Sequence, residues 1–130
     1  MRHLTPLLVA AASVLSTAPA YADLGDQLFK LLPNDGETDD EFGRSVAISG
    51  AIAIVGAYRD NDNGTDSGSA YLFDISDPAN PVQLFKLLAN DGAAGDNFGF
   101  SVAIGGTIAL LGADRDDDNG DLSGSAYLFD

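Results

Sequence analysis

Two short acidic runs contain the residues of this sequence that are best suited to chemistry. Both runs mix carboxylate and amide side chains and end at a glycine, and their members are Asp60, Asn61, Asp62, Asn63, Asp116, Asp117, Asp118 and Asn119. Hard cations such as Ca²⁺ take about 6 to 8 oxygen ligands, and a loop of this composition can wrap one. The pattern therefore predicts metal sites, with Ca²⁺ as the candidate cofactor.

The spacing within these runs leaves the ligand set open. If the glycine is the sixth residue of a DxDxDG-type loop, the first ligand position falls on Arg59 in one run and on Arg115 in the other. A shifted loop would instead use Asp60, Asp62 and a backbone carbonyl. The alternative is that Asp-Asn-Gly forms a tight turn and its carboxylates stay in water.

The other polar residues do not make a familiar catalytic set. The chain has no cysteine, and its one histidine is His3, which argues against thiol nucleophiles and histidine-based triads. Paired carboxylates could act as general acid and base, but here they occur in polar loops without an apolar pocket that would raise one pKa. We therefore predict that the chain is not an enzyme.

The charge balance narrows the range of partners. Six basic residues stand against 20 acidic ones, which gives a formal net charge of −14. Such a chain repels the phosphate backbone, so nucleic acid is not an expected partner. A protein or a glycan is compatible with this charge.

The N-terminus has the features of a secretory signal peptide at residues 1–22. Arg2 and His3 form a basic start, an apolar stretch follows from Leu4 to Leu15, and Ala20-Tyr21-Ala22 is a small-x-small cleavage motif. The apolar stretch is too short for a membrane helix, which needs about 20 residues. We expect a mature chain without a membrane span that is secreted, periplasmic or attached to the cell surface.

An internal duplication organises residues 23–130. Residues 27–74 align without a gap on residues 83–130 at an offset of 56, and 34 of the 48 aligned positions are identical. Agreement at this level indicates two tandem copies of one structural unit.

Each copy predicts four short strands bounded by turn residues. In the first copy they span Gln27–Leu32, Ser45–Ser49, Ala51–Ala57 and Ser69–Ile75. Gly50, and Gly106 in the second copy, would provide the positive φ that a tight hairpin turn between the two middle strands requires. In such a meander the two acid-rich loops of each copy would leave the sheet on the same side and share one rim.

The middle strands are apolar on both faces, which indicates that both faces of each sheet are covered. The predicted fold is all-β, with two four-stranded antiparallel β-propeller blades; the alternative is a β-sandwich. A propeller closes with about 4 to 8 blades. Two blades therefore predict either a fragment of a longer product or part of an oligomeric ring, so that further blades or self-association are needed.

The repeated motifs also resemble a known family. Phe42-Gly43 followed by Val55-Gly56-Ala57, and Phe98-Gly99 followed by Leu111-Gly112-Ala113, are similar to the FG-GAP repeat of integrin-α-type β-propellers. The run from Asp62 to Phe73 resembles the bacterial branch of that family. The resemblance implies that calcium binds in the hairpin that contains this run. It also implies a non-catalytic extracellular or cell-envelope module for binding or adhesion. The alternatives are a structural part of a larger propeller without its own ligand and an accessory part of a secreted hydrolase.

Overall fold

The computed structural model describes residues 24–130 and contains only strands and connecting loops in this range. The predicted signal peptide lies outside the described residues. Within them, no helix is long and apolar enough to cross a membrane. The strands are β1 (Phe42–Ser49), β2 (Ile52–Ala57), β3 (Ser69–Asp74), β4 (Val82–Leu87), β5 (Phe98–Gly105), β6 (Ile108–Ala113) and β7 (Ser125–Phe129).

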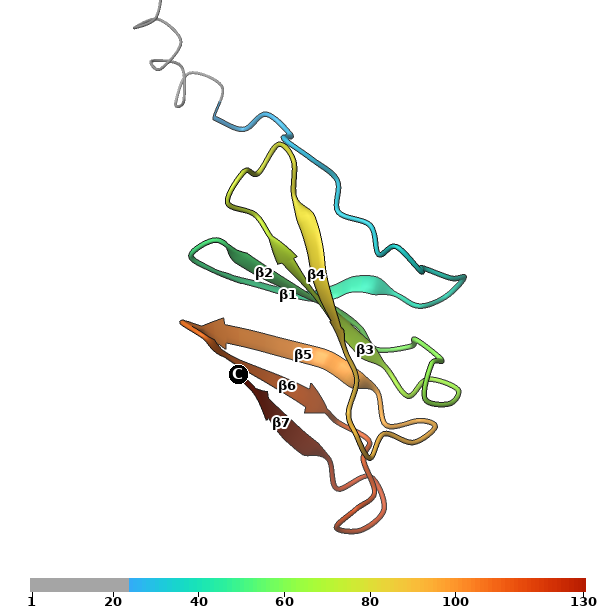
Figure 1. Cartoon of the computed structure of the whole chain (residues 1–130). Helices are drawn as coiled ribbons and strands as arrows, with labels where there is room; N and C mark the ends of the chain where they lie inside the picture. The colour runs from blue at the N-terminus through green and yellow to red at the C-terminus, as the bar shows by residue number, and fades with distance from the viewer. Residues whose placement is uncertain (1–23) are drawn as a thin grey trace, which may run out of the picture.

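The strands form two antiparallel sheets. The first sheet has the order β1-β2-β3-β4 and the second has the order β5-β6-β7, as Figure 1 shows. The prediction of an all-β protein is confirmed, whereas the prediction of two four-stranded sheets is wrong for the second sheet. The tight hairpin turns are also confirmed, because Gly50 and Gly106 have φ values of 56° and 59°.

The fourth strand of the first sheet comes from the second repeat. β4 pairs antiparallel with β3, and Tyr71 lies opposite Lys86 in this register. Its first-repeat counterpart, Gln27–Leu32, was predicted as a strand, and this prediction is wrong because the segment forms no strand pair. The two segments have almost the same residues, so the difference arises from position: β4 follows directly on β3 and can pair with its free edge.

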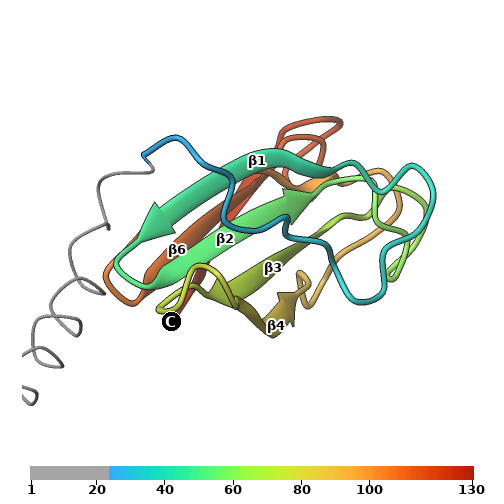
Figure 2. The same cartoon turned by 90° about the horizontal axis from the view of Figure 1, so that it is seen from above.

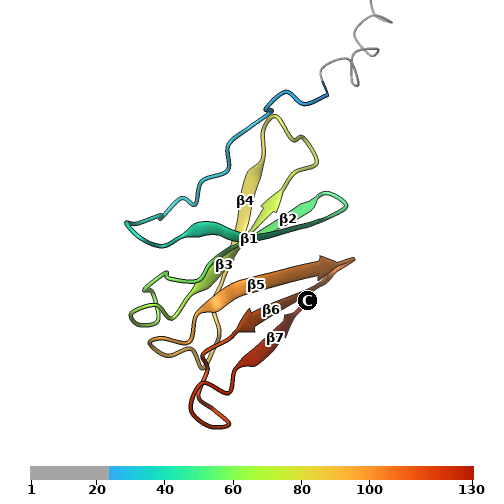
Figure 3. The ribbon, with the colours of Figure 1, turned by 180° about the vertical axis from the view of Figure 1, so that it is seen from behind.

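The two sheets pack face to face through alanines, larger aliphatic side chains and aromatic side chains. β5 lies against β1 and β2, and the sheets are stacked in the views of Figures 2 and 3. Ile54 of the first sheet and Phe98 and Leu111 of the second are fully buried in the shared core. The outer face of the first sheet has its own cluster, which includes Val55, Tyr71 and Phe73.

The Phe-Gly motif of the second repeat brings the two sheets into backbone contact. Phe98 donates its N–H to Ser67 O at 2.9 Å, and Ser45 Oγ donates to Gly99 O at 2.8 Å. A Cβ atom added at Gly99 would lie 2.2 Å from Ser69 O, and one added at Gly56 would lie 2.0 Å from Gly99 O. Only glycine therefore permits this approach.

Each sheet also has a face that exposes apolar side chains. On the first sheet Val46 and Ile48 are 67% and 64% exposed, and on the second sheet Leu128 is 71% exposed, with Ile108 and Leu110 also exposed. Soluble monomers rarely leave such patches uncovered. Both sheets thus have two apolar faces, as the sequence predicted.

Candidate functional site

The acid-rich loops of both repeats lie at one end of the two sheets. They comprise residues 33–41, 58–68, 88–97 and 114–124, which extend beyond the same ends of the strands in Figure 1. Gly95 donates its N–H to Thr65 O at 2.8 Å and Asn97 donates to Asp66 O at 3.1 Å, so loops of the two repeats are hydrogen-bonded to each other. We call these four loops the acidic rim, and the predicted sharing of one rim is confirmed.

Asp60 is the buried anchor of the rim in the first repeat. The residue is only 2% exposed. Its Oδ1 accepts the N–H of Asp62 at 2.9 Å, and its Oδ2 accepts hydroxyl hydrogens from Ser69 at 2.8 Å and Tyr71 at 3.0 Å. Asp60 therefore ties the loop after β2 to the beginning of β3.

Lys86 joins three carboxylates at this anchor. Its Nζ lies 2.6 Å from Asp35 Oδ2, 2.7 Å from Asp60 Oδ2 and 2.6 Å from Asp62 Oδ2. We call these three aspartates the first acidic cluster. Lys86 reaches them from β4, because that strand lies beside β3, and the ammonium also lies 5.2 Å from the centre of the Tyr71 ring. Strand pairing between the repeats thus provides the counter-charge for the loop of the first repeat.

The ammonium of Lys86 and the carboxylates of the first acidic cluster stabilise one another. Burial by itself raises the pKa of Asp60, but hydrogen bonds from Lys86, the Asp62 N–H and Ser69 outweigh it and hold the pKa below its ordinary value. The pKa of Asp35 is lowered against its own burial by hydrogen bonds from Lys86 and Tyr71. Burial lowers the pKa of Lys86, yet the three carboxylates raise it overall. We conclude that the cluster is an ion network rather than a set of free acids.

The second acidic cluster consists of Asp91, Asp116 and Asp118, the equivalents of the first three aspartates. Asp116 Oδ1 accepts the Asp118 N–H at 2.9 Å, and Asp116 Oδ2 accepts hydroxyl hydrogens from Ser125 at 2.5 Å and Tyr127 at 2.9 Å. Within residues 24–130, no lysine or arginine forms an ion pair with this cluster. The charge of Asp116 raises the pKa of Asp118. The second cluster therefore has uncompensated negative charge.

The two clusters differ in how well they fit a divalent cation. In both, three carboxylate oxygens lie within 4.8 Å of one another. In the first, the Lys86 ammonium contacts all three carboxylates, so a cation would have to displace it. The second has the same donor groups without an ammonium, and its hard oxygen ligands suit Ca²⁺. Only the second cluster fits the ion as it stands.

The structure gathers half of the predicted ligand residues and gives most of the others a different role. Asp60, Asp62, Asp116 and Asp118 lie in the two clusters. Two others hold turns, since Asn61 Oδ1 accepts the Asp66 N–H at 2.8 Å and Asp117 Oδ1 accepts the Leu122 N–H at 2.6 Å. Asn63 joins two loops, because its Nδ2 donates to Ala89 O at 3.0 Å, and Asn119 is exposed. Metal binding itself stays a prediction.

Sequence reasoning placed the loops that contain Asp35 and Asp91 on the rim without naming these two aspartates as ligands, and it missed the role of Lys86. The two aspartates occupy matching places in the repeated Asn-Asp-Gly sequence. That repetition was a usable signal. Lys86 gave none, because its role depends on a strand that pairs with the preceding repeat.

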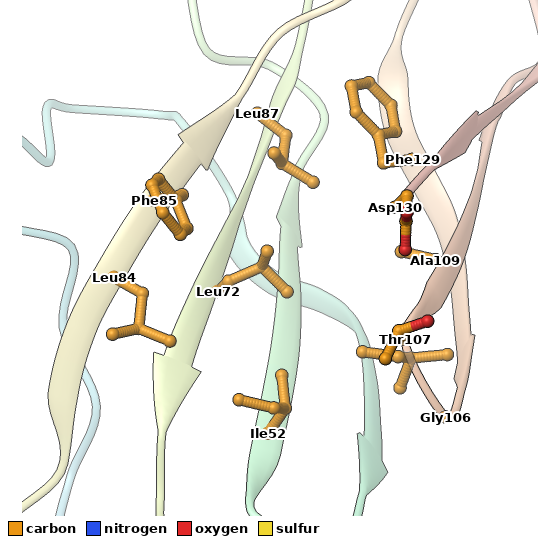
Figure 4. A pocket seen from close by; sticks show the side chains of 11 residues that line it. Ile52, Leu72, Leu84, Phe85, Leu87, Gly106, Thr107, Ala109, Phe129 and Asp130 are labelled. Atoms are coloured by element: carbon orange, nitrogen blue, oxygen red, sulfur yellow. The ribbon is translucent and has the colours of Figure 1, made fainter.

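An apolar groove lies between the two sheets. Figure 4 shows Leu72, Leu84 and Leu87 of the first sheet on one side and Phe129 of the second sheet on the other. The groove has a volume of about 390 Å³, and Thr107 and Asp130 are the polar side chains that line it. The rest of its lining is apolar.

The clusters predict that acid destabilises the protein. Asp35, Asp60 and Asp116 have pKa values below their ordinary value of 3.8. Their contribution is therefore complete above about pH 5 and is lost as the pH falls through the folded-state values. We expect the urea midpoint to fall steadily from pH 5 to pH 2, with a smaller fall in a Lys86→Met variant. A midpoint independent of pH over this range would contradict the ion network.

Comparison with protein families identifies the repeats. The model of the FG-GAP repeat matches residues 26–73 and again residues 81–129. The chain belongs to the FG-GAP repeat family. In this FG-GAP protein the Phe-Gly pairs lie at the beginning of β1 and β5, and the acidic runs follow β2 and β6. Comparison with curated proteins gives no match.

Proposed function

We propose that this FG-GAP protein is a non-catalytic binding or adhesion module that works outside the cytoplasm. The observation that supports it best is the acidic rim. Four loops from two repeats gather exposed carboxylates at one end of an apolar scaffold, which provides a broad contact surface on rigid supports. A protein or a glycan of basic or neutral character suits this surface electrostatically.

We place the two sheets in a β-propeller as neighbouring blades. In a sandwich the residues on the inner faces alternate with outward-facing polar residues. Here both outer faces expose apolar residues, namely Val46 and Ile48 on one and Leu110 and Leu128 on the other. Such faces fit blades that further blades would cover in a complete propeller. This observation also favours a second candidate, a structural part of a larger propeller without its own ligand.

A non-catalytic role agrees with the distribution of polar groups. The groove between the sheets is mostly apolar, and the buried carboxylates Asp60 and Asp116 are held by turn hydrogen bonds, Asp60 also by Lys86. The extracytoplasmic location rests on the signal-peptide features of residues 1–22 and on the family.

Binding by the rim can be tested with charge variants. We expect the purified protein to bind members of a panel of neutral glycans and basic proteins. It should not bind the polyanion heparin. The double variant Asp39→Asn/Asp121→Asn should weaken binding several-fold and reduce its salt dependence, whereas Asp26→Asn, away from the rim, should not. If rim and control variants bind equally, the rim is not the contact surface.

We further propose that Ca²⁺ is confined to the second acidic cluster. Isothermal titration calorimetry with CaCl₂ on the dilute protein should give about one site per chain, because Lys86 occupies the first cluster. Asp118→Asn should weaken this site about ten-fold or more, and Lys86→Met should add a second site. Two sites in the unmodified protein, or an unchanged site in Asp118→Asn, would contradict this assignment.

A further inference from the structure

The edge of the second sheet lacks the strand that completes the first. In the first sheet β4 covers the outer edge of β3, with Ala70 opposite Leu87, Tyr71 opposite Lys86 and Leu72 opposite Phe85. Among the described residues, no strand pairs with the outer edge of β7. β7 repeats the sequence of β3, so its edge presents the same backbone groups and side chains to an incoming strand.

The same chain contains a segment that matches this edge. Gln27–Leu32 has the sequence Gln-Leu-Phe-Lys-Leu-Leu, and residues 83–88, which include most of β4, have the identical sequence. In the structure Gln27–Leu32 forms no strand, and three of its four large apolar side chains, Leu28, Phe29 and Leu32, are 61%, 53% and 64% exposed. The fourth, Leu31, packs against the cluster on the outer face of the first sheet. The chain thus contains a free strand edge on β7 and, in Gln27–Leu32, an unpaired segment with the sequence that pairs with the equivalent edge of β3.

Charge complementarity points to the same pairing. Lys86 neutralises the first acidic cluster from its place opposite Tyr71. The corresponding residue of the free segment is Lys30, which is exposed and belongs to none of the ion pairs of residues 24–130. The second cluster has the carboxylates and the tyrosine but no ammonium. Lys30 opposite Tyr127 would provide it.

The exposed faces repeat the interface that already exists between the sheets. Val102 and Ile104 of the second sheet pack into the shared core, and their equivalents Val46 and Ile48 are exposed. Ile54 of the first sheet is buried in that core, and its equivalent Leu110 is exposed. The outer face of the first sheet in one copy is therefore complementary to the outer face of the second sheet in another.

We propose that copies of this chain associate head to tail by strand donation. Gln27–Leu32 of one copy adds to the edge of β7 of the next, with Lys30 opposite Tyr127 and its ammonium among Asp91, Asp116 and Asp118. The first sheet of the donor then packs on the free face of the second sheet of the acceptor. The contact joins two different surfaces, so it forms rings if the rotation closes and filaments if it does not.

Only the closure of the copies into a ring rests on the proposed propeller arrangement. A propeller has about 4 to 8 blades, so a ring would need two to four copies of this two-sheet chain. Strand addition and the ammonium site do not depend on what the acidic rim binds. They do predict competition with Ca²⁺, because Lys30 and the cation would use the same carboxylates.

Engineered cysteines test the register directly, because the chain has no cysteine of its own. Phe29→Cys in one batch of protein and Leu128→Cys in another should form a mixed disulfide when the two are combined and oxidised. The double variant should give a ladder of covalent oligomers. Phe85→Cys/Leu72→Cys is the matched control, because these residues are paired within one chain and should cross-link without forming oligomers.

The negative control moves the acceptor cysteine away from the edge. Phe29→Cys combined with Ser101→Cys on β5 should give only slow, random disulfides. If Phe29→Cys reacts no faster with Leu128→Cys than with Ser101→Cys, strand donation is overturned. A rapid disulfide confined to single chains of the double variant would also overturn it, because the segment would then close on its own molecule.

Charge reversal tests the ammonium site. Sedimentation velocity over a concentration series without calcium should show concentration-dependent assembly, and Lys30→Glu should weaken the association at least ten-fold because it adds a negative charge to three carboxylates. Asp118→Lys combined with Lys30→Glu should restore part of the association. Added CaCl₂ should dissociate the unmodified protein. A monomer at all concentrations, or assembly unaffected by Lys30→Glu, would overturn the proposal whatever the rim binds.

Discussion

Replacing Lys86 with methionine will lower the free energy of unfolding by about 2 to 3 kcal/mol at neutral pH. The substitution leaves the buried Asp60 beside Asp35 and Asp62 without the ammonium that contacts all three. Breaking a buried pair from one side costs about 3 to 5 kcal/mol, and the exposure of Asp35 and Asp62 to solvent reduces that figure. Urea unfolding followed by circular dichroism measures the effect.

The repeat provides the matched control for this prediction. Lys30→Met makes the same change at the equivalent position. Among the described residues, Lys30 forms no ion pair with a carboxylate. In dilute monomeric protein it should change the free energy of unfolding by less than about 0.5 kcal/mol. The effect of Lys86→Met should shrink as the pH falls through the lowered folded-state pKa values of Asp35 and Asp60, because these carboxylates then gain protons. Equal losses in both variants would refute the special role of Lys86.

Replacing Gly99 with alanine will lower the free energy of unfolding by about 4 kcal/mol or more. The added Cβ would lie 2.2 Å from Ser69 O, which is a backbone atom of the other sheet and cannot move aside by rotating a side chain. The φ of Gly99 is 86°, which adds strain for any residue with a Cβ. The two sheets would have to separate where they are closest, and the loss of packing would follow. Chemical denaturation of the variant measures the loss.

Gly43 separates the two causes of that loss. It is the same residue of the first repeat, its φ is 98°, and a Cβ added there meets no atom within 4 Å. Gly43→Ala should therefore show the backbone strain alone, about 1 to 2 kcal/mol. The difference between the two variants reports the close approach of the sheets. If the two substitutions cost the same, backbone contact between the sheets does not limit position 99.

Local pattern was sufficient for much of the architecture. The β-branched and alanine-rich runs predicted β2 and β6, and glycines at the turns predicted the hairpins at Gly50 and Gly106, because these features depend on neighbours in the chain. The acidic rim also followed from the sequence, since antiparallel strands return their loops to the same end. The predicted ligands were less successful, because the side chains of Asn61 and Asp117 hold turns and that of Asn63 joins two loops, through hydrogen bonds that spacing alone does not reveal.

By itself the sequence determined that this protein is all-β, acidic and built from two copies of one unit. The tertiary structure alone decided which segment completes the first sheet. β4 and Gln27–Leu32 share their sequence, and only β4 lies beside an open strand edge. The same fact decided that a lysine pairs with the first acidic cluster and, among the described residues, none pairs with the second. Strand pairing depends on which edge is within reach, and residues of identical type cannot encode that difference locally.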